Sequence, residues 1–414
     1  MDYFGNSHFE PSDIDTTGTV DETQKISSYQ ISYPYLKLPK GKIRANIQVP
    51  SGGSVVGYGN PPMDRTTKVW DASGTLVIGS VSVTGSEDWV AGNFSVDGFA
   101  VGNAVYGVND KTERGLLKNI TARGNDHGFL LEQNGSDNIG MSGGNIVVED
   151  CVTHDGPNGF VTKMLNVTFR RCMAYDVTVQ AYVVASDNIN GKNIYSRATR
   201  TRLENCRSDG CWQGTTVYSR DCFSLDNSNS VNGTQNTYID CTHTNVGNCQ
   251  VHVGFYHPVS GFTPIDNYQV TIGGGEYSYA PVFGIRFDDA ARPRVTAGFF
   301  SNCPNHIVFG VNCSDPVVSD QVTYYGPVNG ILSPYIVECS GLATIGVDIV
   351  RDLIVFRNTK ATTIYSITTT NARKKIAFTI DDNFTSLSIY GKIYTGKGLS
   401  GHLISDGLSW AVIT

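Results

Sequence analysis

The sequence predicts an all-β protein: a parallel β-helix solenoid with a small N-terminal cap and a β-rich C-terminal piece. Three observations predict this fold. The 414 residues are rich in Gly, Asn, Thr, Ser, Val, Ile and Tyr, which is typical of many short strands joined by turns. Only 17% of the residues are charged, and few stretches have the charged amphipathic pattern of helices. The middle of the chain repeats a unit of two short strands, and such repeats indicate a solenoid.

The chain divides into three predicted parts: a cap (1–60), the parallel β-helix (61–358) and a C-terminal segment (359–414). A β-helix ends in strands with unpaired backbone groups, so capping or oligomerisation must cover both ends. The C-terminal segment alternates polar and apolar residues between Gly turns, which predicts antiparallel strands. We expect this segment to serve in oligomerisation.

A cysteine motif marks the repeats. An apolar residue, one or two polar residues and a Cys recur at Val148–Cys151, Phe169–Cys172, Leu203–Cys206 and Ile239–Cys241. The Cys lie 21, 34 and 35 residues apart, and uneven steps suit a β-helix because loops can grow at any corner. Later copies keep the strands without this Cys, at Tyr268–Asp289 and Pro293–Asn312. A Cys that closes successive strands acts as a small buried hydrophobe, so we predict free buried thiols.

Composition and the opening residues exclude several classes of protein. The formal charge is −7 and no block of Lys and Arg occurs, so no nucleic-acid partner is expected. No run of 18 apolar residues occurs, so we expect no membrane insertion. The opening MDYFGNSHFE lacks the charged and apolar regions of a secretory signal. The ten Cys include no C-x-x-C pair and the His are scattered, so no metal or cofactor is expected.

Three N-terminal motifs, in this order and spacing, carry a resemblance to a known superfamily. They are Gly18–Thr23 (GTVDET), Leu38–Ile43 (LPKGKI) and Val49–Gly59 (VPSGGSVVGYG). They resemble the opening of pectate-lyase-like proteins, in the branch of phage tailspikes and polysaccharide depolymerases. With the repeats, the resemblance covers about residues 15–350. In this chain the stretch between Thr23 and Leu38 is shorter than in that superfamily, so we expect its N-terminal helix to be stunted or absent.

The resemblance implies a right-handed β-helix that acts on polysaccharide. It also implies a homotrimer, a location in the virion tail, and a phage tail or adaptor protein as a partner. Without a secretory signal, such a protein is made in the host cytoplasm. The superfamily contains lyases, hydrolases, esterases and epimerases, so the resemblance leaves the chemistry open.

Hydrolysis of a glycosidic bond needs two carboxylates, one protonated as the acid and one ionised as the base or nucleophile. Outward side chains of adjacent strands form columns about 4.8 Å apart, so carboxylates one or two rungs apart fit this chemistry. One candidate column follows the second strand of each unit: Glu132, Lys163, Asp226, His257 and Asp288. The other lies in the polar turn: Asp155, Asp176, Asp209 and Asn245. Asp and Asn at repeated turns also stabilise corners, and that structural interpretation stays open for both columns.

The first choice for the catalytic carboxylates is Asp226 and Asp288, with Asp209 and Asp176 behind them. The residues Asp226, His257 and Asp288 recur 31 residues apart, and His257 could orient a carboxylate or act as a base. Aromatic faces stack on sugar rings, and a cation can bind an acidic sugar. The predicted substrate-binding residues are Trp212, Tyr218, His252, Tyr256 and Arg286.

The leading functional hypothesis is a bacteriophage tailspike that depolymerises a bacterial capsule or O-antigen by endo-glycosidic hydrolysis. One alternative is a polysaccharide lyase, in which His257 removes a proton and Arg286 neutralises a uronate. The other alternative is a receptor-binding spike without catalysis, in which the carboxylates are structural.

Overall fold

A computed structural model of the whole chain provides the structure. It describes the residues 7–108, 111–132, 144–164, 166–185, 201–218, 237–239, 241–253, 267–268, 270–274, 276–278, 283–287, 290–291, 293–301, 305–309, 317–318, 322–325, 335–337, 344–346, 348–349, 353–356, 362–364, 366–368, 374–380, 385–389, 392–405 and 410–413.

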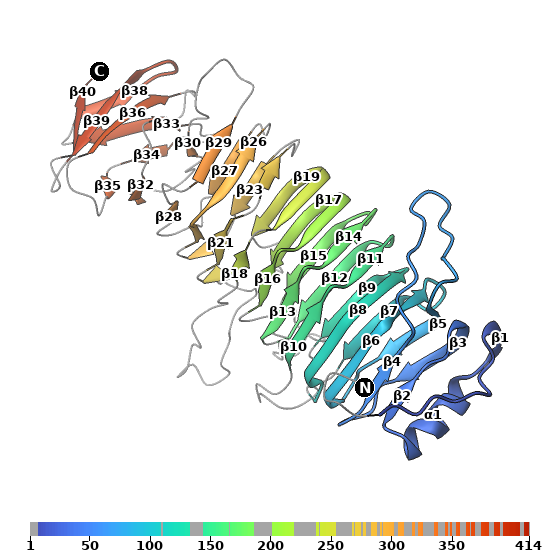
Figure 1. Cartoon of the computed structure of the whole chain (residues 1–414). Coiled ribbons are helices and arrows are strands. Elements are labelled where there is room, and N and C mark those ends of the chain that lie inside the picture. The colour runs from blue at the N-terminus through green and yellow to red at the C-terminus, as the bar shows by residue number, and fades with distance from the viewer. Residues whose placement is uncertain are drawn as a thin grey trace.

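The chain winds into a solenoid with three ladders of parallel strands (Figure 1). Four long strands, β6, β8, β17 and β19, bend across a corner and belong to two ladders each. The first ladder contains β2 (Tyr35–Lys37), β4 (Ser54–Val56), β6 (Glu87–Gly98), β8 (Glu113–Gly124), β10 (Gly144–Glu149), β13 (Val167–Arg170), β16 (Arg202–Glu204), β18 (Thr237–Ile239), β21 (Thr271–Gly273), β25 (Arg294–Val295), β28 (Val317–Val318) and β32 (Asp348–Ile349).

The second ladder contains β1 (Thr17–Asp21), β3 (Gly41–Gln48), β5 (Thr75–Ser82), the later parts of β6 and β8, β11 (Val152–His154), β14 (Met173–Tyr175), the first parts of β17 (Arg207–Tyr218) and β19 (Thr242–Val253), β22 (Glu276–Ser278), β26 (Gly298–Ser301) and β29 (Val322–Tyr325). The third contains the end of β5, β7 (Asn103–Val108), β9 (His127–Glu132), β12 (Asn158–Lys163), β15 (Gln180–Ala185), the ends of β17 and β19, β23 (Phe283–Phe287) and β27 (Asn305–Phe309). A short pair, β20 (Asn267–Tyr268) and β24 (Ala290–Ala291), lies outside the ladders.

The strand register confirms the rung steps that the cysteine motif predicts. Ile146 pairs with Val167, Thr168 with Arg202, and Leu203 with Tyr238, which are offsets of 21, 34 and 35 residues. Most of the buried apolar side chains form one continuous core and stack between rungs, whereas Leu130, Val161 and Val183 of the third ladder form a separate cluster. One such stack joins the rings of Phe129, Phe160 and Tyr182, with centroids 4.7 and 5.1 Å apart.

The motif cysteines form one inward column, and all six cysteines in the described ranges are free and buried. The thiol of Cys172 donates to the Val148 carbonyl oxygen at 3.3 Å, and that of Cys206 to the Phe169 carbonyl at 3.4 Å. Burial raises the pKa of the Cys151 thiol to about 12. The prediction of free buried thiols is therefore confirmed for these residues.

The polar residue before Cys151, Cys172 and Cys206 makes a corner. Asp150, Arg171 and Asn205 have φ of 54°, 52° and 53°, in the left-handed region that Asn and Asp tolerate best among non-Gly residues. The chain turns there, and the Cys that follows points into the core. The cysteine motif is thus a corner followed by an inward residue.

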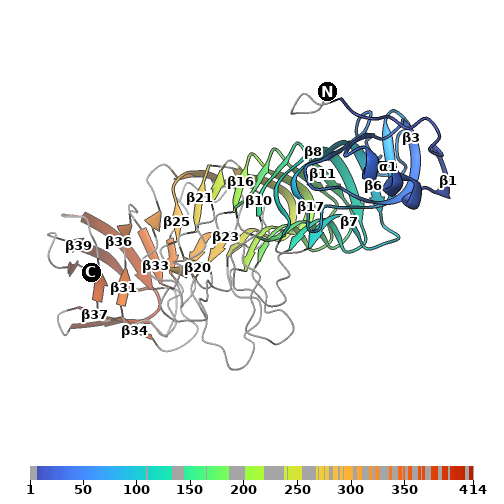
Figure 2. The same cartoon turned by 90° about the horizontal axis from the view of Figure 1, so that it is seen from below.

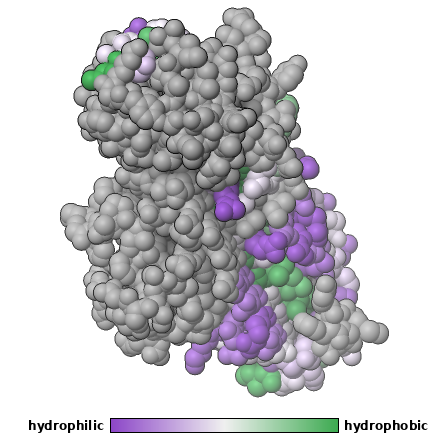
Figure 3. All heavy atoms as spheres, turned by 90° about the vertical axis from the view of Figure 1, so that its left-hand side faces the viewer, coloured by the Kyte–Doolittle hydropathy of each residue, from purple (hydrophilic) through white to green (hydrophobic). Residues whose placement is uncertain are grey.

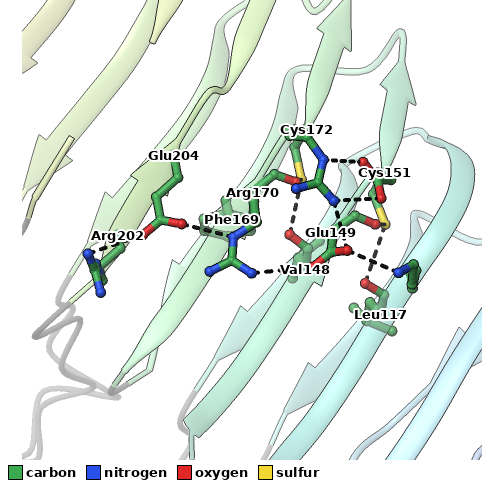
Figure 4. A network of polar contacts seen from close by, with 12 residues as sticks. Leu117, Val148, Glu149, Cys151, Phe169, Arg170, Cys172, Arg202 and Glu204 are labelled. Atoms are coloured by element: carbon green, nitrogen blue, oxygen red, sulfur yellow. Dashed lines mark hydrogen bonds and ion pairs between the residues drawn. The ribbon is translucent and has the colours of Figure 1, made fainter. Parts of the chain in front are cut away.

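The outer surface of the first ladder carries a charged network across four rungs, drawn in Figure 4. Glu149 accepts ion pairs from Lys118 at 3.0 Å and Arg171 at 2.8 Å, and Arg170 pairs with Glu204 at 2.9 Å. Because each charge faces an opposite one on the next rung, the network favours the observed register. Figure 3 views the molecule from the C-terminal side, and most of the coloured surface there is hydrophilic.

The N-terminal segment corrects one expectation. A ten-residue helix, α1 (Thr23–Ser32), is present, although the short stretch predicted a stunted or absent one. The helix fits because only Tyr33 and Pro34 separate it from β2, and its Ile26 is fully buried. Within the described part of the chain, no helix is long and apolar enough to cross a membrane.

The tail contains antiparallel pairs, as its alternating pattern predicts: β36 with β39, β39 with β40, and β37 with β38. Parallel pairs also join it to the strands before it, β33 with β36 and β31 with β35 (Figure 2). Its strands and those preceding them are β30 (Tyr335–Val337), β31 (Thr344–Gly346), β33 (Leu353–Phe356), β34 (Thr362–Ile364), β35 (Ser366–Thr368), β36 (Lys374–Ile380), β37 (Thr385–Ile389), β38 (Lys392–Thr395), β39 (Ser400–Ser405) and β40 (Trp410–Ile413).

Candidate functional site

Three carboxylates line the corner between the second and third ladders. Asp155 follows β11, Asp176 follows β14, and Asp209 lies in β17 on the next rung. Asp155 and Asp176 have φ of 59° and 54°, so they take the left-handed corner that Gly210 takes on the next rung, at 77°. We call Asp155, Asp176 and Asp209 the carboxylate row.

A hairpin finger, residues 62–71 between β4 and β5, reaches the row. Met63 bridges Trp70 in antiparallel fashion, and the Asp64 amide donates to the Val69 carbonyl at 2.9 Å. The Asp64 carboxylate accepts bonds from the amides of Thr66 and Thr67, which fixes the tip. The finger is the blue loop that rises beside the solenoid in Figure 1.

Two cations of the finger bind the row. Arg65 donates to Asp176 at 2.6 Å and to Asp209 at 2.7 Å, and thus joins two rungs. Lys68 donates to Asp155 at 2.6 Å and to Asp176 at 3.3 Å. The hydrogen bonds from Arg65 lower the pKa of Asp176, and its charge and Lys68 add to the effect. Asp176 is therefore ionised at neutral pH.

A column of three side chains on successive rungs lies beside the carboxylate row. Arg123, His154 and Tyr175 pair across successive rungs. The rings of His154 and Tyr175 stack with centroids 5.2 Å apart, and the Arg65 guanidinium lies 4.5 Å from the Tyr175 ring centre. Arg123 forms an ion pair with Asp155 at 3.1 Å, without hydrogen-bond alignment. Burial lowers the pKa of His154 to about 4, so its imidazole is neutral at pH 7.

An exposed aromatic follows the same corner. Trp212 lies three residues after Asp209 and is 53% exposed. A Cβ on Gly247 would come within 2.5 Å of its indole, so the ring lies against the backbone of the next rung. Val179, on the preceding rung, is 41% exposed. An apolar ridge therefore runs beside the carboxylate row.

The other predicted site residues lie elsewhere or outside the described ranges. His252 pairs with Arg286 across β19 and β23, on the third ladder; the offset of these strands is 34 residues, whereas the predicted step between His257 and Asp288 is 31. Tyr218 ends β17, where it pairs with Ala185. Glu132 and Lys163, in the same ladder, form an ion pair at 3.1 Å. Four predicted residues lie outside the described residues: Asp226, His257, Asp288 and Tyr256.

The structure thus brings together Asp176, Asp209 and Trp212, and it separates them from His252 and Arg286. Sequence reasoning missed Arg65 and Lys68, because nothing in an exposed loop signals contact with residues up to 144 positions away. No group of His, Cys, Asp or Glu within the described ranges could hold a metal ion.

Comparison with known proteins defines the fold. No family model matches the chain, and no curated protein matches it. Solved structures do match it, and they place the chain among right-handed parallel β-helix proteins.

Two of these structures cover most of the chain. The A-module of the mannuronan C-5 epimerase AlgE4 from Azotobacter vinelandii has a TM-score of 0.52 and 12% identity, over 91% of this chain and 92% of its own. The tailspike of E. coli bacteriophage HK620, solved with a pentasaccharide, has a TM-score of 0.50 and 11% identity, over 90% and 78%. At such identities the likeness shows the fold and not the function.

Proposed function

We propose that the chain is a bacteriophage tailspike that binds and depolymerises a bacterial surface polysaccharide by endo-glycosidic hydrolysis. The observation that carries the proposal is the ridge of Val179 and exposed Trp212 beside the carboxylate row. An aromatic face suits the apolar side of a sugar ring, and ionised carboxylates accept bonds from its hydroxyls. The fold of the phage tailspike solved with a pentasaccharide supports a glycan as the ligand. The proposal includes a homotrimer in the virion tail.

The hydrolytic carboxylates proposed from the sequence are Asp226 and Asp288. Within the carboxylate row, Asp176 is not suited to be the general acid, because its pKa is lowered, whereas a general acid needs a raised pKa. Asp176 therefore suits a base or a binding group rather than the proton donor.

A lyase is the second candidate, and one observation favours it. His252 and Arg286 pair on adjacent rungs, and both side chains are partly exposed. An imidazole and a guanidinium about 4.8 Å apart along the solenoid could remove a proton and neutralise a uronate.

Incubation of the protein with capsule and O-antigen preparations tests the proposal, with products sized and scanned for ultraviolet absorbance. Shorter chains without a new chromophore are expected from a hydrolase, and Asp226→Asn and Asp288→Asn should abolish the shortening while binding persists. Shorter chains that absorb as unsaturated uronates would establish the lyase instead. Binding without shortening would leave a receptor spike.

Trp212→Ala tests the ridge separately. Loss of a central aromatic contact should weaken glycan binding roughly tenfold or more. Ile31→Ala is the matched control, because Ile31 is 87% exposed on α1, at the N-terminal end. Equal affinities for the two variants would exclude the ridge as the binding surface.

A further inference from the structure

The hairpin finger is held in place by hydrogen bonds within itself and to the solenoid, apart from its contacts with the carboxylate row. Its own bonds close the hairpin: at the base the Asp71 amide donates to the Pro62 carbonyl at 3.0 Å, and near the tip Lys68 takes a left-handed φ of 57°. Its base is anchored by Ser95, which donates to the Pro61 carbonyl at 2.7 Å. Trp70 donates its indole N–H to Asp97 at 2.9 Å. The finger is therefore a pre-organised arm rather than a loose loop.

The hairpin finger places positive charges between the carboxylates of the row. Asp155 and Asp176 occupy the same position on adjacent rungs, where like charges repel each other. Lys68 lies between them, and Arg65 joins Asp176 to Asp209. Each of these carboxylates is partly exposed, with side-chain exposures of 16%, 33% and 22% in chain order.

We propose that the hairpin finger positions the carboxylate row. Through Arg65 and Lys68 it holds the carboxylates of Asp155, Asp176 and Asp209, on three successive rungs, so that their oxygens can accept hydrogen bonds from the hydroxyls of a glycan. This inference rests on the proposed function, and it assigns Asp176 and Asp209 to substrate binding rather than to proton transfer. Arg65 and Lys68 are then positioning residues. An ionised carboxylate has about four acceptor sites, so each carboxylate can bind the finger and a hydroxyl together.

His154 provides an independent sign of a polar ligand. Its side chain is 4% exposed, and its Nδ1 has no hydrogen-bond partner. The imidazole lies close enough to the row and the finger that Asp155, Lys68, Asp176 and Arg65 all act on its pKa. Buried polar atoms of native proteins nearly always have partners, so a polar ligand or solvent belongs beside this ring. The hydroxyls of a sugar would satisfy that need.

The positioning role is tested without any activity assay. Carboxyl ¹³C titration of Asp-labelled protein, assigned with Asp176→Asn, follows the Asp176 carboxyl directly. Arg65→Gln and Lys68→Gln should each move its pKa upward, because each removes a hydrogen-bond donor and a positive charge. Arg114→Gln is the matched control: Arg114 also joins carboxylates of two rungs, Asp88 and Glu113, but on the first ladder. An Asp176 titration that matches wild type in Arg65→Gln would overturn the positioning role.

The binding role is tested with short oligosaccharides from the capsule or O-antigen that the protein cleaves or binds. Asp176→Asn should weaken binding roughly tenfold, since it removes one charged hydrogen bond, and largely retain the cleavage rate at saturating glycan. A rate reduced about a thousandfold or more at unchanged affinity would make Asp176 catalytic and overturn the assignment. A wild-type protein that binds no glycan would overturn this role and the proposed function together. The carboxyl titration would then still decide whether the finger positions the row.

Discussion

A buried histidine makes the middle rungs sensitive to acid. His243, in β19, is fully buried, and its two ring nitrogens lie 2.8 Å from the Ser208 hydroxyl and 2.9 Å from the Thr215 hydroxyl. A Cβ on Gly214 would come within 2.3 Å of the imidazole, so the ring lies close against the backbone. The two hydroxyls satisfy a neutral imidazole, whereas an imidazolium would bring a charge into the core. Burial accordingly lowers the pKa of His243 to about 3.

The size of the effect follows from proton linkage. The pKa of His243 is lower in the folded than in the unfolded chain, so the folded state binds fewer protons. Its contribution to stability is complete above about pH 6.5 and is lost as the pH falls from there toward 3. Between pH 7 and pH 5 the free energy of unfolding should fall by about 2 kcal/mol through this one residue.

His243→Gln removes the titration and keeps an amide that can bond both hydroxyls. Urea unfolding of the wild type and the variant, followed by circular dichroism between pH 7 and pH 5, measures the difference. At pH 7 the variant should be the less stable of the two, because it loses the packing of the ring near Tyr182. By pH 5 its deficit should shrink by about 2 kcal/mol. Parallel stability curves over this range would refute the reasoning, because His154 and all other titrating groups are common to both proteins.

Two further predictions concern the core and the corners. The thiols of Cys151, Cys172, Cys206 and Cys241 should not react with a disulfide reagent at pH 8 until urea unfolds the chain, because their burial excludes the reagent; labelling of these four in the native protein, mapped by mass spectrometry, would contradict the buried column. Gly124→Ala should cost about 1–3 kcal/mol in urea unfolding, because the new Cβ would come within 1.9 Å of the His127 carbonyl oxygen; a variant as stable as wild type would show that this corner packs differently.

The sequence predicts the rungs well because their signals are local. A polar residue that tolerates a positive φ, followed by an inward Cys, is readable at Asp150, Arg171 and Asn205. The spacing of these motifs equals the residue offset between paired strands, because each corner lies at a fixed position next to its strand. The N-terminal helix was misjudged because its length was inferred from spacing, whereas a two-residue link leaves room for ten helical residues.

The candidate site is less accessible to sequence reasoning. The turn residues Asp176 and Asp209 can be recognised as a recurring pair, but both accept hydrogen bonds from Arg65, which precedes them by 111 and 144 residues, and these bonds lower the pKa of Asp176. Only the folded chain brings a loop between two early strands against corners three and more rungs later. The step of 31 residues that links Asp226, His257 and Asp288 in the sequence likewise differs from the observed register, because β19 and β23 pair with an offset of 34 residues.

The two kinds of corner show why the carboxylate row is more than a set of turns. At the corner between the first and second ladders, which includes the cysteine motifs, the stacked residues satisfy each other: Asn119 donates to Asn93 at 2.9 Å, and Arg171 to Asp150 at 2.7 Å. At the row, carboxylates follow one another on adjacent rungs, and the cations that join neighbouring carboxylates, Arg65 and Lys68, come from the finger, while Arg123 of β8 pairs with Asp155 alone. Asn would make the same turn without repulsion, since it adopts the left-handed region at least as readily as Asp. A corner alone therefore does not require this charge, and this is why we propose that the carboxylate row serves a glycan ligand as well as the turns.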